Sequence, residues 1–76
     1  MNVGDKVKFT APVDRFPWFL IEAGATGEVT YKDDMFLTVK MDPPFDDAGE
    51  MWGDLVEFRL DDEHERHDAN TLKVIA

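Results

Sequence analysis

Two loops of this sequence carry aromatic side chains that could bind a partner. The first loop, FPWFL, holds Phe16, Trp18 and Phe19, and the second, DPPFDDAGEMWGD, holds Phe45 and Trp52. Tryptophan and phenylalanine on a rigid rim are frequent hot spots of protein interfaces. The same rings could instead pack inside, because a chain of 76 residues needs its large apolar groups to stabilise a small core.

The second loop is also acidic and contains no basic residue. If its rings lie beside the first loop, they form an aromatic floor with an acidic rim made by Asp42, Asp46, Asp47, Glu50 and Asp54. Such a surface suits a proline-rich or apolar segment that carries Arg or Lys. The alternative is a solvated acidic loop with one tryptophan in the core. The residues predicted to bind a partner are Phe16, Trp18, Phe19, Phe45, Asp46, Asp47, Glu50 and Trp52.

The segment DDEHERHD is a candidate metal site. In a helix, His64 would lie near His67 and Asp68, and side chains at this spacing converge on one face. A solvated charged turn is the preferred interpretation, because only two histidines are present and the zinc motif His-Glu-x-x-His is absent. A calcium loop from Asp46 to Glu57 also fails, since Met51 stands where glycine is needed. We therefore predict no metal and no cofactor.

Catalysis has little support in the residue types. The chain contains no serine and no cysteine, which removes the commonest nucleophiles and every disulfide. Carboxylates are numerous, but they lie in segments that should be wet, where a general acid does not gain the raised pKa that it needs. We predict that the protein is not an enzyme.

The net charge of −9 is concentrated in one part of the chain. The segment from Asp42 to Asp68 holds eleven acids and two bases, which accounts for the whole excess. A surface of this sign repels nucleic-acid phosphates and anionic lipids and favours a protein or peptide partner of basic character. No apolar run approaches the roughly 20 residues that span a bilayer. The start MNVGDKVKF lacks a signal-peptide core. We expect a cytoplasmic protein that binds neither nucleic acid directly nor membrane.

Strands must position these loops, and alternating apolar and polar residues predict five of them. They are Asp5–Thr10, Thr26–Tyr31, Phe36–Met41, Leu55–Leu60 and Thr71–Ala76. Pro12 and Pro17 turn the segment after the first strand into a long folded-back loop. In the third strand Leu37, Val39 and Met41 face inward, or the opposite set does if the register slips by one residue.

Glycines and charged residues mark the connections. Gly24 suits a turn that needs positive φ, and Gly27 indicates a bulge or a close backbone approach. The stretch KDDM predicts a short hairpin connection, although it lacks Asn-Gly. The segment 61–70 has no apolar stripe, so we expect a polar turn of helix or a mobile loop there rather than a packed helix.

Two motifs carry a resemblance to a known family. The stretch VGDKVKFT, followed by AGATGEV and an alternating strand, resembles the SH3-like β-barrel superfamily, in particular its small bacterial and phage members. The stretch EMWGDLVEF is similar to the Trp-Asp-Asn strand start in such proteins. The resemblance implies one all-β domain over residues 1–76: a small five-stranded SH3-like barrel with a long aromatic loop after strand one and an acidic loop before strand four. It also points to a phage or marine bacterial source.

Three functions are compatible with these features. The leading hypothesis is a non-enzymatic protein-binding module that uses the aromatic loops and their acidic rim. The second is an acidic mimic of nucleic acid that inhibits a DNA- or RNA-binding protein by occupying its basic groove. The third is a structural protein that buries the aromatic loops in a homo-oligomer.

Overall fold

A computed structural model of the protein describes residues 1–15, 19–43 and 54–75. This part of the chain forms mostly strands with one short helix, so the expectation of an all-β protein is confirmed. The elements are β1 Lys6–Phe9, β2 Val13–Arg15, β3 Phe19–Ile21, β4 Thr26–Lys32, β5 Phe36–Met41, β6 Leu55–Arg59, α2 Glu63–Ala69 and β7 Leu72–Val74.

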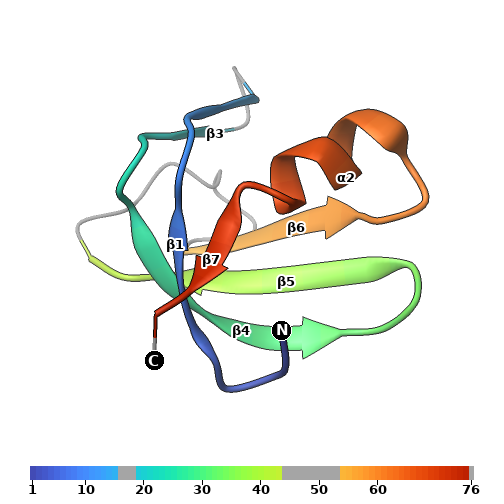
Figure 1. Cartoon of the computed structure of the whole chain (residues 1–76), viewed down its shortest axis with the longest axis horizontal. Helices are drawn as coiled ribbons and strands as arrows, with labels where there is room; N and C mark the ends of the chain where they lie inside the picture. The colour runs from blue at the N-terminus through green and yellow to red at the C-terminus, as the bar shows by residue number, and fades with distance from the viewer. Residues whose placement is uncertain (16–18, 44–53, 76) are drawn as a thin grey trace.

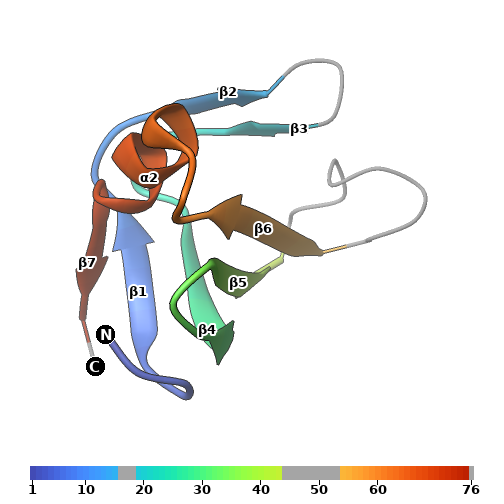
Figure 2. The ribbon, with the colours of Figure 1, turned by 90° about the vertical axis from the view of Figure 1, so that its right-hand side faces the viewer.

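Five of these strands form one antiparallel sheet in the order β6-β5-β4-β1-β7. The last strand, β7, returns to lie beside the first (Figure 1). The sheet is curved, and the hairpin of β2 and β3 lies with α2 at one end of it (Figure 2). Within the described residues β6 and β7 are the two edges of the sheet, and no pairing between them closes it into a barrel.

The segment after β1 differs from the loop predicted for it. It contains the antiparallel hairpin of β2 and β3, in which Val13 pairs with Ile21 and Arg15 pairs with Phe19. The described residues therefore form seven strands where the sequence predicted five. Pro12 does not prevent this, because it precedes β2 and owes no N–H to the ladder. Val13 and Ile21 are both buried, so the hairpin is held by the core as well as by its own hydrogen bonds.

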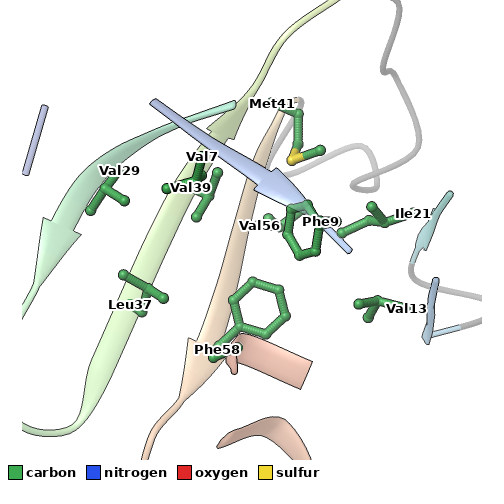
Figure 3. Close-up of a cluster of buried hydrophobic side chains, with 11 residues drawn as sticks. Val7, Phe9, Val13, Ile21, Val29, Leu37, Val39, Met41, Val56 and Phe58 are labelled. Carbon is green, nitrogen blue, oxygen red and sulfur yellow. The ribbon is translucent and has the colours of Figure 1, made fainter. Parts of the chain in front are cut away.

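The core is built from alternate residues of the strands. Val7 and Phe9 of β1 and Val56 and Phe58 of β6 are buried, and the rings of Phe9 and Phe58 lie 5.9 Å apart (Figure 3). In β5 the inward set is the first of the two alternatives that the sequence left open, since every second side chain is buried. The remaining buried residues are Val13, Ile21, Val29, Leu37, Val39, Met41 and Ala69.

Glycines shape the start of β4, as expected. Gly24 has φ +94°, a conformation that residues with a Cβ rarely adopt. A Cβ on Gly27 would lie 2.6 Å from the backbone oxygen of Lys40, so β4 and β5 approach closely at this point. The irregularity in the pairing of β4 with β5 lies between Val29 and Tyr31. Gly27 therefore marks the close approach, and the bulge is further along the strand.

The connection from β4 to β5 is stabilised by an aspartate. The Asp33 carboxylate accepts the backbone N–H of Met35 at 2.7 Å and of Phe36 at 2.8 Å, and it also accepts the Tyr31 hydroxyl. The hydrogen bond from Tyr31, followed by those from the backbone, lowers the pKa of Asp33. An Asx turn of this kind explains how KDDM makes a tight hairpin without Asn-Gly.

Candidate functional site

Most of the residues predicted to bind a partner lie outside the described residues. These are Phe16, Trp18, Phe45, Asp46, Asp47, Glu50 and Trp52. Phe19 begins β3, where its backbone pairs with Arg15. Its side chain is not among those that the structure describes. The described part of the candidate site therefore consists of the strand ends that carry the two loops.

The strand ends that carry the two loops lie on the same side of the molecule. Figure 2 shows the end of β2, the start of β3 and the start of β6 on that side. The backbone N–H of Met41 donates to the backbone oxygen of Asp54 at 2.7 Å. This hydrogen bond brings the two ends of the acidic segment together at the neighbouring strands β5 and β6.

The carboxylate of Asp42, at the start of the acidic segment, accepts hydrogen bonds from two neighbouring side chains. It accepts the Thr26 hydroxyl at 2.7 Å and the Lys6 ammonium at 3.1 Å. The hydrogen bond from Thr26, followed by that from Lys6, lowers the pKa of Asp42. Asp42, which the sequence analysis placed on the rim of the groove, thus also attaches the base of the acidic segment to β1 and β4.

An open depression lies beside this anchor. It has a volume of about 400 Å³ and is lined by the turn of residues 22–26 and by residues 41–43. The small side chains of Ala23, Gly24 and Ala25 leave this space open, and Glu22 and Asp42 are the carboxylates beside it. A depression with carboxylates at its border suits a cationic side chain better than an anionic one.

Arg15 connects the β2–β3 hairpin to α2. Its guanidinium donates to the Asp68 carboxylate at 2.7 Å and 3.0 Å, lies 3.2 Å from the Glu65 carboxylate and stands 5.6 Å from the centre of the Phe58 ring. Burial alone lowers the pKa of Arg15, but the hydrogen bonds to Asp68 and Glu65 outweigh it and raise that pKa. The base of the first aromatic loop is therefore held by ion pairs.

The segment 61–70 contains a short polar helix, one of the two alternatives expected from the sequence, but the ion pairs show that this helix packs against its neighbours. A helix without an apolar stripe packs here through charge, with Ala69 as its buried residue. Glu65 and Asp68 are three residues apart and share one helix face, which is the signal in the sequence that could have indicated a cationic partner. Arg15 is 53 residues away from Asp68, so no local pattern in the sequence connects that face with Arg15.

The candidate metal site of His64, His67 and Asp68 is not formed. Asp68 binds Arg15, while His64 and His67 line a shallow surface depression with Asp62 and Glu63. Among residues 1–15, 19–43 and 54–75 no group of three or more His, Asp or Glu side chains is placed to hold a metal ion.

Basic residues gather on the outer face of the sheet, a feature that the net charge concealed. Lys6 and Lys8 alternate with the buried Val7 and Phe9, so they point away from the core. Lys73 pairs with Lys8 across β7 and β1, and Lys40 occupies the same face on β5. Arg59 alternates with the buried Phe58 on β6, so five of the eight basic residues of the chain lie on this face, together with Glu28 opposite Lys6 and Lys40.

Comparison of the chain with protein-family models, with characterised proteins and with solved structures finds no match. The part of the chain that the structure describes contains no helix long and apolar enough to cross a membrane.

Proposed function

We propose that this chain is a non-enzymatic binding module of the SH3-like barrel type, and that it binds a protein or peptide segment of basic character. Three features of the strand arrangement support the fold. A hairpin-bearing segment follows β1, a tight connection joins β4 to β5, and β7 returns beside β1. The motifs VGDKVKFT and AGATGEV, which carry the resemblance, lie on β1 and on the turn into β4.

One observation carries the function. The hydrogen bond between Met41 and Asp54 brings the two ends of the acidic segment together, on the side of the molecule where β2 ends and β3 begins. The segment 42–54 has five acidic residues and no basic one. The depression between residues 22–26 and 41–43 lies at its base. A basic side chain of the partner would enter that depression while aromatic residues of the loops contact its apolar part.

Matched peptides test the charge requirement. We would measure binding of fluorescent proline-rich peptides that carry either Arg or Gln at one position, by anisotropy. We expect the Arg peptide to bind the wild type more tightly. We expect D46N/D47N to weaken that binding about three- to tenfold, because two partner charges lose their counterparts. The control is D34N/E57Q, which changes the net charge equally at two exposed positions outside the acidic segment.

Two results would contradict this function. Equal weakening by the variant and by its control would reduce the effect to the net charge of the protein. Binding that falls steeply with salt but is unchanged in W18A/W52A would favour the nucleic-acid mimic. A basic protein groove recognises carboxylates, whereas the proposed module should lose about 30-fold or more with its aromatic anchors.

A further inference from the structure

We propose that the open edge of β7 binds an extended peptide by strand addition, and that this peptide has an acidic residue flanked by apolar residues. This surface is separate from the acidic segment, and its partner has the opposite charge. The inference therefore goes beyond the proposed function and can fail independently of it.

The hydrogen bonds between β1 and β7 define which backbone groups face outward. Thr10 donates to Thr71, and Ile75 donates to Lys6, so alternate residues of β7 bond to β1. In an antiparallel ladder the residues between them direct both backbone groups away from the neighbouring strand. In β7 these residues are Leu72 and Val74. Neither has a backbone hydrogen bond to any other described residue, so a new strand would find two donors and two acceptors.

The side chains of β7 define the apolar part of the partner. Val74 pairs with the buried Val7, and Leu72 pairs with the buried Phe9, so both lie on the core face of the sheet. Val74 is nevertheless 43% exposed, because β7 is the last strand on this side. Apolar residues opposite Leu72 and Val74 would extend the core beyond its present edge.

The charges on the outer face define the central residue of the partner. Lys73 and Lys8 are cross-strand neighbours, and neither forms an ion pair with a described residue. By contrast, Lys6 and Lys40 each lie opposite Glu28. A strand added to β7 would place one residue opposite Lys73 in a non-hydrogen-bonded pair, where side chains approach most closely. A carboxylate there would compensate the two neighbouring lysines.

A second copy of this chain fits the edge less well than such a peptide. If Leu72 of one copy bonds to Val74 of the other, Lys73 faces Lys73 and the like charges repel. The two adjacent hydrogen-bonding registers place Ile75 or Thr71 opposite Lys73. None of these three registers supplies the carboxylate, whereas an acidic peptide does.

Charge-matched peptides test the central residue. Short peptides with the core Val-Glu-Val, Val-Gln-Val or Val-Lys-Val would be titrated with the protein by anisotropy. We expect the Glu peptide to bind about two- to fivefold more tightly than the Gln peptide, and the Lys peptide to bind most weakly. In K73E the order of the Glu and Lys peptides should reverse. An unchanged order in K73E would overturn the proposal.

A proline substitution tests the backbone contact. V74P removes the outward N–H but leaves the hydrogen bonds from β7 to β1 in place, because those involve Thr71, Lys73 and Ile75. We expect V74P to weaken the Glu peptide about tenfold and V74T, which keeps the N–H, to change it less than about twofold. Circular dichroism of both variants checks folding, and the K73E reversal remains decisive if V74P does not fold.

Two further outcomes are informative. Equal binding by V74P and V74T would overturn the strand addition. A wild-type dimer in sedimentation experiments that V74P dissociates would assign the edge to a second copy and also overturn it. D46N/D47N should leave the Glu peptide unaffected, so failure at this edge is distinguishable from failure of the acidic segment.

Discussion

The two edge strands of the sheet, β6 and β7, differ in the contacts that their outward-facing backbone groups make. At the β6 edge, α2 contacts the strand, and the backbone N–H of Arg59 donates to the Glu65 carboxylate at 3.2 Å. Arg15 reaches the same helix from the β2–β3 hairpin and lies over Phe58 of β6. At the β7 edge, Leu72 and Val74 direct their backbone groups outward with no partner among the described residues.

The difference shows how a short polar helix can protect an edge. A helix of seven residues such as α2 is too short to be stable alone in water, and here Ala69 is its one buried residue. It is held by its cap at Asp62 and by the ion pairs with Arg15. Covering an edge prevents unwanted strand pairing. The fold covers the Arg59 end of β6 in this way and leaves β7 with one lysine as its only charge.

The largest expected effect is a difference in stability between a substitution in β6 and one in β7, because β6 contributes more buried side chains to the core. Phe58 of β6 is fully buried against Phe9, so F58A should destabilise the protein by about 3–5 kcal/mol. Val74 of β7 is 43% exposed, so V74A should stay within about 0.5 kcal/mol of the wild type. Urea unfolding monitored by tryptophan fluorescence measures both. Comparable losses would mean that β7 is as much part of the core as β6.

Removal of the Arg15 side chain should loosen α2 and expose the backbone of β6 at Arg59. Its side chain is 18% exposed and that of Asp68 is 13% exposed, so these pairs lie between surface and buried ion pairs. We expect R15A to destabilise the protein by about 1–3 kcal/mol. Hydrogen exchange of the Arg59 amide should accelerate, while exchange at Leu72 and Val74 should be unchanged. The control is R66A, because the Arg66 side chain is exposed and its one hydrogen bond among the described residues is to the Leu60 backbone oxygen at 3.4 Å. Equal effects of both variants would contradict the role of Arg15.

At acid pH, protonation of Asp62 should destabilise α2 and so weaken its contact with β6. The Asp62 carboxylate accepts the Glu65 N–H at 3.0 Å, and this hydrogen bond lowers the pKa of Asp62. A carboxyl group whose pKa is lower in the folded state contributes stability above its ordinary pKa, near 3.9, and this contribution is lost as the pH falls through the folded value.

Two substitutions of Asp62 separate the cap from its titration. D62A should accelerate exchange of the Glu65 and Arg59 amides at neutral pH, because the cap is lost. D62N should preserve the cap, since asparagine also accepts this hydrogen bond, and should reduce the loss of stability in acid. Unfolding measured between neutral pH and pH about 2 tests this, and identical acid profiles for D62N and the wild type would exclude the cap as the cause.

The smallest expected effect concerns Lys8 and Lys73 at the β7 edge, which form no ion pair with another described residue. K73E would place a carboxylate opposite Lys8 and should stabilise the protein by about 0.2–1 kcal/mol. The matched control is K40E, which would place a second carboxylate opposite Glu28 and should destabilise by a similar amount. Thermal unfolding at low salt measures both changes. A loss of stability in K73E would show that Lys8 and Lys73 do not repel each other.

Local patterns were sufficient to locate the strands of the large sheet. The alternation of Leu37, Val39 and Met41 correctly located β5, and the predicted starts of β4, β5 and β6 agree with the structure. The turn at Gly24 and the close approach at Gly27 were also predicted correctly. These features depend on residues that are near one another in sequence, so a local pattern contains enough information to predict them.

The β2–β3 hairpin could not be predicted in the same way. Its strands have three residues each, and Pro12 and Pro17 argued for a loop. Its stability comes from the burial of Val13 and Ile21 and from the ion pairs of Arg15 with α2. These contacts are distant in sequence, so no local pattern reports them.

The amino-acid sequence by itself determined where most strands begin, which of their faces is apolar and where the acidic residues concentrate. Only the tertiary structure decided which charges meet. It placed Asp68 on Arg15 and Asp42 on Lys6 and Thr26, so these carboxylates are already engaged. It also placed Lys8 beside Lys73 at an uncovered edge. The physical reason is strand order, because pairing β7 with β1 and resting α2 on β6 brings together residues that the chain keeps far apart.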